Sequence, residues 1–331
     1  MPEVSVLLPV RNAENTVAAA VRSILDQTHD DFELIVIDDG STDRTAHIVA
    51  DIRDKRLKLI PSQHAGVCAA NNLGTAAAQS DLIARMDADD WAHPERLEQQ
   101  VAYLRQHKVD VVGCKVRILD AAGQPSSTLR RYERWINEET LTTDQIHALR
   151  FVEFPLVNPT LLARRSYFEI GFEDNDLPED YDLMLRAMAQ GFRFGKVPDV
   201  LLHWTDGPTR LTRTDPRYSP TAFMECRRRH LLTGPLRDVR TLDLWGAGQT
   251  GKPWLLWLQR QGIHVRRLID VHHGKIGQTI HGVPVIAADQ LPMSDGVPLI
   301  IAVGADRTRN LIWPHVTVRG FRPGQDTWFV A

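Results

Sequence analysis

Apolar runs of strand length alternate with helix-spaced apolar residues from residue 4 to residue 86, and this alternation limits the possible folds more than any other feature. Helical patterns cover residues 17–25, where apolar side chains recur on one face, a second stretch through Ile48, Val49 and Ile52, and residues 66–79. Between them we expect strands at Val4–Val10, Phe32–Ile37, Leu57–Ile60 and Asp81–Met86. Strand–helix–strand units of this kind predict an α/β fold, a mostly parallel sheet with helices on both faces.

The pattern continues less regularly up to residue 234. Pro94–Gln106 and Tyr181–Gln190 are predicted helices, whereas Val109–Leu119 and Phe192–Trp204 are predicted to be extended. The polar segment Ala121–His147 has no clear period, and we expect a long surface excursion there.

The strand–helix pattern restarts after Thr233-Gly234-Pro235, which we take as a domain boundary. A strand at Thr241–Trp245 is followed by the turn GAGQTG, a helix at Lys252–Gln261 and a strand at Val265–Ile269. We therefore predict two domains, residues 1–234 and a small Rossmann-like unit at 235–331.

The composition limits the classes of protein to which the chain can belong. Hydrophobic residues make up 43% of the chain, enough to bury a core and to exclude disorder over most of its length. Lysine and arginine number 39 against 42 acidic residues, a net charge of −3, which argues against a nucleic-acid partner. The three cysteines form no metal-type pair or disulfide framework, and no apolar run is long enough to cross a bilayer. We expect a cytoplasmic protein.

Carboxylates follow two of the predicted strands. Asp38 and Asp39 end the second, and Asp87 and Asp89 end the fourth, in RMDADD. Ligands of open α/β sheets bind at this edge. Carboxylate oxygens suit Mg²⁺ or Mn²⁺, which are held by one or two carboxylates together with substrate phosphates.

Four segments, in order and spacing, resemble the signature regions of family 2 inverting glycosyltransferases of the GT-A fold. The resemblance covers roughly residues 1–215, and it implies a metal-dependent transfer of sugar from a nucleotide-diphosphate donor, most naturally a UDP-sugar. The segments are VSVLLPVRNAEN, SILDQTHDDFELIVIDDGSTDRT, ARMDADD and LPEDYDLMLRAMAQG.

The resemblance implies a role for each matching residue on the donor side. Asp39 is expected to accept a hydrogen bond from the base, and Asp38 is either its partner or a turn cap for Ser41. Asp89 is expected to bind the metal, with Asp90 as a supporting carboxylate. The other expected nucleotide-binding residues are Pro9, Val10, Arg11, Glu14, Arg85 and Asp87.

On the acceptor side the resemblance implies that Asp180 is the general base, which takes the proton of the attacking hydroxyl and leads to inversion. The alternative for Glu179 and Asp180 is an acidic helix start that complements the helix dipole. His203 is either a metal ligand or a structural histidine, because the family pattern is not clean there. Arg210 and Arg213 are expected to bind phosphate from a loop, or else to lie in a solvated basic segment.

Further residues have weaker assignments. Asn158 and Thr160 could touch acceptor hydroxyls. The run Arg227-Arg228-Arg229-His230 is either a solvated helix face or a contact to an anionic lipid-linked acceptor or membrane surface. The expected partners are thus a nucleotide-sugar donor and a saccharide or lipid-linked acceptor, in surface polysaccharide or glycoconjugate synthesis. The sequence leaves the oligomeric state open.

The turn GAGQTG fits G-x-G-x-x-G between a strand and a helix, and Asp270 lies near the expected position of a ribose-binding acid. Gly246, Gly248, Gly251 and Asp270 are therefore a predicted nucleotide loop. Three interpretations stay open: a structural appendage, a sugar-nucleotide site, and an NAD site. We do not expect NAD as a cofactor, because no partner for hydride transfer is evident. Two other functional classes compete with the transferase, namely a non-catalytic sugar-nucleotide sensor and an NAD-dependent oxidoreductase.

Overall fold

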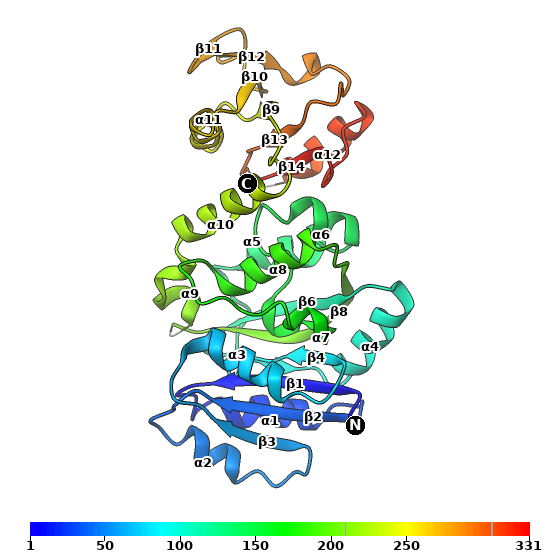
Figure 1. The fold of residues 1–331 in the computed structure, drawn as a ribbon, viewed down its shortest axis with the longest axis vertical. Helices are drawn as coiled ribbons and strands as arrows, with labels where there is room; N and C mark the ends of the chain where they lie inside the picture. Colours follow the sequence, from blue (N-terminus) through cyan, green and yellow to red (C-terminus); the bar gives the residue numbers. More distant parts are fainter. Residues whose placement is uncertain (209, 306) are drawn as a thin grey trace. The chain divides into compact units, whose positions relative to one another are not determined.

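The structure is a computed structural model that describes residues 1–208, 210–305 and 307–331. Its chain divides into two compact units. Unit 1 comprises residues 1–146 and 156–223, and unit 2 comprises residues 147–155 and 224–331 (Figure 1). Each unit has its own sheet.

Unit 1 begins with four parallel strands in the order β3-β2-β1-β4. They are β1 (Val4–Val10), β2 (Phe32–Asp38), β3 (Leu57–Pro61) and β4 (Leu82–Arg85). All residues of β2 are buried, as their continuous apolar run predicts for a strand covered on both faces. The chain adds β2 and β3 on one side of β1 and β4 on the other, so the strand order reverses at β1. Such a reversal opens a crevice at the carboxyl ends of the strands.

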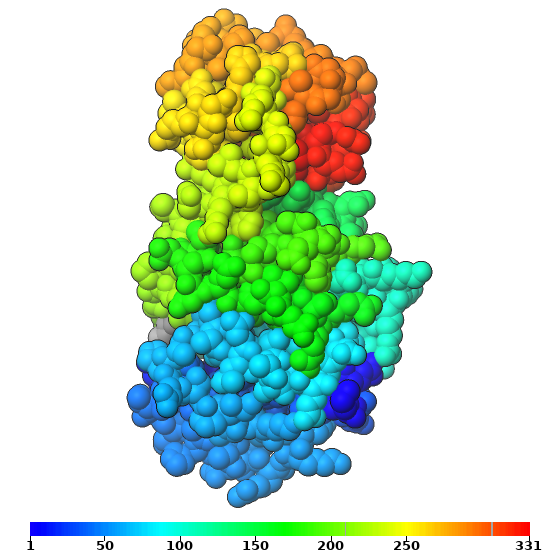
Figure 2. Space-filling view, in the orientation of Figure 1, coloured from blue at the N-terminus to red at the C-terminus, as the bar shows by residue number. Residues whose placement is uncertain are grey.

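Three helices connect these strands: α1 (Val17–Leu25), α2 (Thr45–Ala50) and α3 (Gly66–Ala77). Helix α3 packs against β1 and β2. Its close approach needs Gly74, because a Cβ atom there would lie 2.8 Å from Ile37 Cδ1 and 3.3 Å from both Leu7 methyl groups. The N-terminal segment that carries these elements packs as one continuous blue region in the space-filling view (Figure 2).

The sheet of unit 1 continues as β7-β6-β8-β5. These strands are β5 (Trp91–Ala92), β6 (Val111–Asp120), β7 (Leu162–Arg164) and β8 (Phe194–Asp206). Strand β7 is antiparallel to β4 and β6, and β5 is antiparallel to β8, whereas β6 and β8 are parallel. The sheet is therefore mostly parallel, with two reversed strands. Helix α4 (Arg96–His107) packs against β6, β7 and β8.

The polar segment 121–147 is a mostly exposed loop up to residue 129, as expected, but from residue 130 it is helical and partly buried, so the expectation of a surface excursion was wrong for that part. It contains α5 (Arg130–Arg134), the π-helix η1 (Trp135–Glu139) and α6 (Thr143–Leu149). Trp135 is only 6% exposed. The side chain of Asn137 attaches this segment to β6, because it accepts a hydrogen bond from Val116 N (2.9 Å) and donates one to Val116 O (2.8 Å).

The remaining elements of this part of the chain are short, apart from two helices. Helix α8 starts with the Glu179-Asp180 pair, and the chain leaves it through Gly191 at a φ of 90°. The elements are η2 (Asn158–Thr160), α7 (Arg165–Phe168), α8 (Glu179–Ala189), α9 (Leu211–Thr214), η3 (Pro216–Tyr218) and α10 (Pro220–Thr233).

Unit 2 has a sheet in the order β11-β12-β10-β9-β13-β14, parallel except for β11. Helices α11 (Gly251–Arg260) and α12 (Thr308–Val318) and the short η4 (Ala288–Gln290) accompany it. The strands are β9 (Thr241–Trp245), β10 (His264–Asp270), β11 (Thr279–Ile280), β12 (Val283–Ala287), β13 (Leu299–Ile301) and β14 (Thr327–Phe329).

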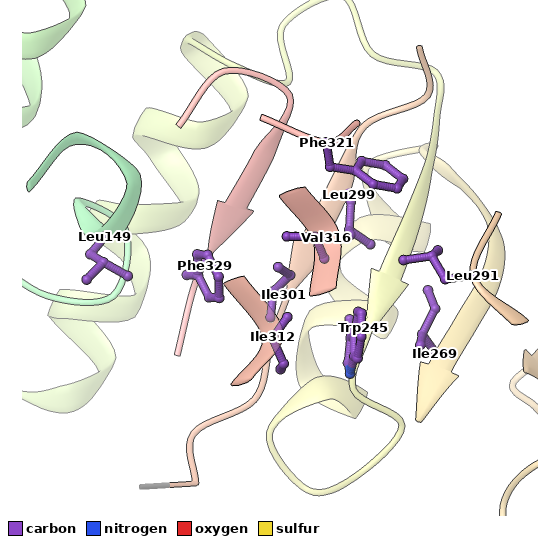
Figure 3. Packing of buried hydrophobic residues seen from close by; sticks show 10 residues of the cluster. All are labelled: Leu149, Trp245, Ile269, Leu291, Leu299, Ile301, Ile312, Val316, Phe321 and Phe329. Atoms are coloured by element: carbon purple, nitrogen blue, oxygen red, sulfur yellow. The ribbon is translucent and has the colours of Figure 1, made fainter. Parts of the chain in front are cut away.

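The core of unit 2 includes a residue from far upstream in the chain. Leu149, at the end of α6, is 2% exposed and belongs to the same hydrophobic cluster as Trp245, Ile301 and Phe329 (Figure 3). By contacts, residues 147–155 and 224–234 therefore group with the second sheet, whereas the boundary at residue 234 from sequence assigned them to the first domain. The three cysteines are free and buried.

Candidate functional site

The carboxyl ends of β1 and β2 lie side by side, because Val10 pairs with Asp38 in the parallel register. The segment expected to line the base and ribose pocket starts here. Pro9 is partly buried, Val10 is buried and Arg11 is exposed. These three residues therefore lie at the sheet edge that the resemblance requires, and their contact with a nucleotide stays a prediction.

Glu14 connects the two loops that follow β1 and β2. Its Oε2 accepts a hydrogen bond from Arg44 N (3.1 Å), and its own N donates to Asp43 Oδ2 (3.1 Å). Asn12, at a φ of 50°, accepts a bond from Thr42 N (2.8 Å) beside it. The structure thus gives Glu14 a role in holding these loops together, in addition to the predicted nucleotide contact.

Asp38 serves as a cap for the turn after β2. Its Oδ1 accepts hydrogen bonds from Ser41 N (3.2 Å) and from the Ser41 hydroxyl. The carboxylate is 7% exposed. This geometry is the turn-capping alternative raised from the sequence, and a direct role in nucleotide binding stays a prediction.

Asp39 binds the start of α3. Its Oδ1 accepts hydrogen bonds from Ala65 N (2.8 Å) and the Ser62 hydroxyl (3.2 Å), and Oδ2 accepts one from Gly66 N (2.9 Å), with His64 Nδ1 at 3.5 Å. Burial acts to raise the pKa of Asp39, but these donors hold it below its usual value. The carboxylate is ionised and acceptor-only, as the predicted contact to a base N–H demands, and most of its acceptor capacity is used by the loop at 62–66.

Arg85 and Asp87 form an ion pair at the end of β4. Arg85 is 2% exposed, and its guanidinium lies 2.9 Å from Asp87 Oδ1 and donates to Met86 O (2.9 Å). Arg85 Nε is buried and has no hydrogen-bond partner among the described residues. A fixed guanidinium beside a half-exposed carboxylate is suited to a ribose or diphosphate.

Three carboxylates after β4 form a group that could hold a metal ion. One ligand atom from each of Asp87, Asp89 and Asp90 lies within 4.8 Å of the others. Asp90 is buried, and its Oδ1 accepts a hydrogen bond from Thr205 N of β8 (2.8 Å). Its Oδ2 is buried without a hydrogen-bond partner in the described part of the chain.

The charges in this group favour a cation. Burial and the neighbouring charge of Asp87 raise the pKa of Asp89 to about 6, and burial together with Asp89 and Asp87 raises the pKa of Asp90. Arg210 acts on both pKa values in the opposite direction. Crowded carboxylates with an orphaned oxygen fit a divalent ion, and hard oxygen ligands suit Mg²⁺ or Mn²⁺.

Asp180 lies in the first turn of α8, beside the buried Glu179. Burial, and then the charge of Glu179, raises the pKa of Asp180 to about 8. The charges of Asp87 and Arg85 also act on this pKa, so the carboxylate lies near the donor-side residues. A carboxyl group tuned toward neutral pH at this position is suited to accept a proton.

Tyr218 is a site residue that the sequence did not reveal. Its hydroxyl donates a hydrogen bond to Glu179 Oε2 (2.6 Å), and Glu179 is 2% exposed. Burial raises the pKa of Glu179, and this bond opposes the rise. Tyr218 lies in η3, far from the recognised motifs, and nothing in its local pattern distinguishes it from a surface tyrosine.

The two arginines predicted for a phosphate-binding loop have different surroundings. The Arg210 guanidinium lies 3.8 Å from the ring centroid of Trp204, and its charge reaches Asp89 and Asp90. Arg213 instead makes two 2.7 Å bonds to the oxygens of Asp206. Arg210 is thus the better placed for a donor phosphate, and phosphate binding by either arginine stays a prediction.

His203 lies beside the carboxylate group rather than in it. It pairs with Trp91 across β8 and β5, and the two rings are 4.8 Å apart between centroids. Burial, and then the charges of Arg117 and His93, lower its pKa. These contacts match the structural alternative raised from the sequence, and metal binding by His203 stays a prediction.

Of the two residues suggested for the acceptor, Thr160 is unsuitable. It is fully buried, and its hydroxyl donates to Val157 O (2.6 Å). Asn158 is partly buried in η2 and keeps its suggested role as a prediction.

In unit 2 the predicted nucleotide loop lies between β9 and α11. Gly246, Gly248, Gly251 and Asp270 line one cavity. Of the basic run on α10, Arg227 donates to Val152 O (2.9 Å), and Arg228 lies over Trp254 at 5.4 Å from its ring centroid. Contact of this run with a membrane stays a prediction. In the described residues no helix is long and apolar enough to cross a bilayer.

Known proteins resemble this chain in sequence. Residues 5–171 match the family model described as glycosyl transferase family 2. The chain is 30% identical over 251 residues to "Putative glycosyltransferase EpsE" of Bacillus subtilis (strain 168), covering 72% of this chain and 85% of that protein. It is 26% identical over 232 residues to the O-antigen biosynthesis glycosyltransferase WbnJ of Escherichia coli, covering 67% of this chain and 85% of WbnJ.

Solved structures resemble it in fold. The chain aligns with S. aureus TarS 1-349 in complex with UDP-GlcNAc at a TM-score of 0.55 and 23% identity, over 70% of this chain and 67% of that one. It aligns with the mannosyltransferase PcManGT from Pyrobaculum calidifontis, in complex with GDP-Man and Mn²⁺, at a TM-score of 0.50 and 20% identity, over 79% and 69%. The chain has the GT-A fold and belongs to glycosyl transferase family 2.

Proposed function

We propose that unit 1 transfers a sugar from a nucleotide-diphosphate donor, probed first as a UDP-sugar, to an acceptor hydroxyl with inversion at the anomeric carbon. The observation that carries the proposal is that a crowded carboxylate group follows β4, and that the charge of its member Asp87 contributes to the raised pKa, about 8, of Asp180 at the start of α8. The complexes of TarS with UDP-GlcNAc and of PcManGT with GDP-Man and Mn²⁺ support this donor chemistry.

In this proposal the donor lies across the ends of β1, β2 and β4. Arg85, fixed by Asp87, holds the diphosphate or ribose, and Arg210 contacts the phosphates. Asp89, with Asp87 and Asp90, would hold Mn²⁺ or Mg²⁺, and such an ion would neutralise charge on the departing diphosphate.

Asp180 takes the proton of the acceptor hydroxyl as that oxygen forms its bond to the anomeric carbon and the bond to the diphosphate breaks. One displacement from the opposite face inverts the configuration. A positioned base contributes about 10²–10⁴-fold to such a step. WbnJ acts in O-antigen biosynthesis, and the similarity to it supports a saccharide acceptor in the synthesis of a surface polysaccharide. A lipid-linked acceptor and a location on the cytoplasmic side of the membrane are part of the proposal.

Donor binding tests the first half of the proposal. Calorimetric titration of the full chain with UDP is expected to show a component that needs Mn²⁺ and disappears in EDTA. Asp89→Ala is expected to remove this component, whereas Asp51→Ala, which changes an exposed carboxylate outside the group, is expected to keep it. Binding that ignores both Mn²⁺ and Asp89→Ala would contradict the donor site.

The base is tested by Asp180→Asn, with Asp176→Asn as a matched control at an exposed carboxylate just before α8. Asp180→Asn is expected to lower transfer by about 10²–10⁴-fold and to change Mn²⁺-dependent UDP binding by less than about threefold. Sugar transfer is measured with UDP- and GDP-sugars and saccharide acceptors. A variant that keeps full transfer would refute Asp180 as base. A wild-type chain that binds donors and transfers nothing would instead support the sensor.

A further inference from the structure

Unit 2 contains a cavity of about 570 Å³ that the proposed transferase chemistry does not use. It opens at the carboxyl ends of the parallel strands β9, β10 and β13, the edge where open α/β sheets bind ligands. Trp245 and Ile312 join its lining to the hydrophobic core of the unit (Figure 3). The volume lies in the range of small-molecule sites.

The glycines of the turn GAGQTG, between β9 and α11, have two different roles. Gly246, at a φ of 122°, and Gly251 are required by the turn itself, because a Cβ atom would lie 2.5 Å from Ala302 O at the first and 1.8 Å from Gly246 O at the second. Gly248 has no such constraint. Among the described residues, the atom within 4 Å of a Cβ there is Lys275 Nζ, at 3.4 Å. The bare backbone at Gly248 therefore faces the cavity, beneath a lysine.

Most of the acceptor capacity of Asp270 is used within the protein. Its Oδ1 accepts a hydrogen bond from His272 N (2.8 Å), and its Oδ2 accepts bonds from Ala247 N (3.0 Å) and Lys275 Nζ (2.9 Å). Burial acts to raise the pKa of Asp270, but these donors hold it below its usual value. In a dinucleotide site the acid at this position accepts from the ribose hydroxyl. Here it fixes Lys275 over the glycine turn instead.

The cavity also has an apolar mouth. Val271 is 71% exposed and Leu311 is 74% exposed, and both line the opening together with the side chain of Val303. Apolar side chains that line a cavity are typical of small-molecule sites. A cation and open backbone at one end and apolar side chains at the other fit a ligand with a phosphate end and a flat, weakly polar end.

We propose that this cavity binds a nucleoside diphosphate, with its phosphates against Lys275 and the glycine turn and its nucleoside against Val271 and Leu311. The first turn of α11 would present its backbone N–H groups to the same phosphates. The occupied Asp270 disfavours a dinucleotide. This site is separate from the donor site of unit 1 and does not depend on a metal ion.

Calorimetry of the full chain in EDTA tests the proposal, because the donor site of unit 1 is expected to be silent there. The probes are UDP, GDP and ADP, with NAD⁺ and inorganic pyrophosphate as comparisons. At least one nucleoside diphosphate is expected to bind with about one equivalent, and Asp89→Ala is expected to leave this binding unchanged.

Two variants locate the binding. Lys275→Ala and Gly248→Val are each expected to weaken it at least tenfold. A Cβ atom at residue 248 would meet, within 4 Å among the described residues, the flexible end of Lys275, so a variant there keeps the test valid if Lys275→Ala fails to fold. Arg260→Ala is the control, an exposed cation in the last turn of α11 that lies outside the cavity lining. Thermal melting checks that each variant is folded.

Four outcomes would overturn the proposal. They are no saturable binding of UDP, GDP or ADP in EDTA at millimolar concentration, binding unchanged in both cavity variants, tighter binding of NAD⁺ than of any diphosphate probe, and pyrophosphate binding as tightly as the nucleotide. Loss of only the Mn²⁺-dependent UDP component would contradict the transferase site and leave this one intact, so the two proposals fail separately.

Discussion

Tyr218→Phe removes one hydrogen bond from a buried carboxylate and leaves the aromatic packing in place. The lost bond is the one from the Tyr218 hydroxyl to Glu179 Oε2, 2.6 Å long. Glu179 is 2% exposed, so water cannot readily replace the donor. A hydrogen bond to a charged group is worth about 1.5–3 kcal/mol. The variant therefore disfavours the ionised form of Glu179.

The consequence for Asp180 follows from the coupling between the two groups, which titrate as a pair. The charge of Glu179 is the second cause, after burial, of the raised pKa of Asp180. When Glu179 becomes neutral, the pKa of Asp180 falls. With a pKa of about 8, roughly one tenth of Asp180 is ionised at pH 7. Full ionisation would thus raise kcat/KM at pH 7 by at most about tenfold.

We expect the acidic limb of the pH profile of kcat/KM to move to lower pH in Tyr218→Phe, with a gain of between about two- and tenfold at pH 7. The assay is initial-rate sugar transfer between pH 5.5 and 9. Tyr103→Phe is the control, because Tyr103 stacks on His107 within α4 and lies outside the site. The urea midpoint of the Tyr218 variant is expected to fall, and to fall further at pH 8 than at pH 5.5.

An acidic limb that stays in place, or that moves to higher pH in a folded variant, would refute the reasoning. Glu179 would then not be the charge that sets the pKa of Asp180. Loss of activity at all pH values with an unchanged limb would instead show that the Tyr218 hydroxyl acts on a substrate.

Two further predictions concern stability. Lys196 is 1% exposed and donates to the Thr140 hydroxyl (2.6 Å), and burial lowers its pKa to about 7. Between about pH 7 and 10.5 the unfolded chain therefore binds a proton at Lys196 that the folded chain does not. The free energy of unfolding rises with pH over this range, by at most about 1.4 kcal/mol per pH unit. Lys196→Met is expected to flatten that rise in urea denaturation, and parallel pH profiles of the wild type and the variant would contradict the lowered pKa of Lys196. Gly251→Ala would place a Cβ atom 1.8 Å from Gly246 O, so we expect a loss of more than about 3 kcal/mol in unit 2, seen as a lowered melting transition. Gly262→Ala is its control, since Gly262 has a positive φ but no neighbour within 4 Å among the described residues; a loss in Gly251→Ala no larger than that in Gly262→Ala would contradict the cost assigned to the close contact.

Local patterns determined the regular parts of the fold. The predicted strand Val4–Val10, the strand Thr241–Trp245 and the helix at 17–25 have the bounds that the structure gives to β1, β9 and α1. Each of these elements is predicted from the periodicity of apolar side chains within the element itself, and its buried face needs only another apolar face to pack against. The sequence also placed Asp87, Asp89 and Asp180 correctly at strand ends or a helix start, because turn and cap chemistry is local.

Tertiary structure decided what pairs with what. Strand β5 has two residues and no pattern of its own, and it exists because β8 lies beside it. The segment 121–147 is too polar to be predicted as packed, yet Asn137 satisfies the backbone of Val116, and Trp135 is buried. Leu149 joins the core of unit 2 although most of that core follows residue 224. These contacts form only when the folded chain brings together residues that are far apart in the sequence.

The same division holds within the two sites. Sequence identified Asp39, Asp180 and Asp270 as acids in meaningful places, since residue type and motif spacing are written along the chain. Only the folded chain shows that loop 62–66 occupies much of Asp39, that Tyr218 supports Glu179 beside Asp180, and that Lys275 engages Asp270. The reason is physical: a carboxylate's charge and free lone pairs depend on donors and burial, and distant segments of the chain supply both.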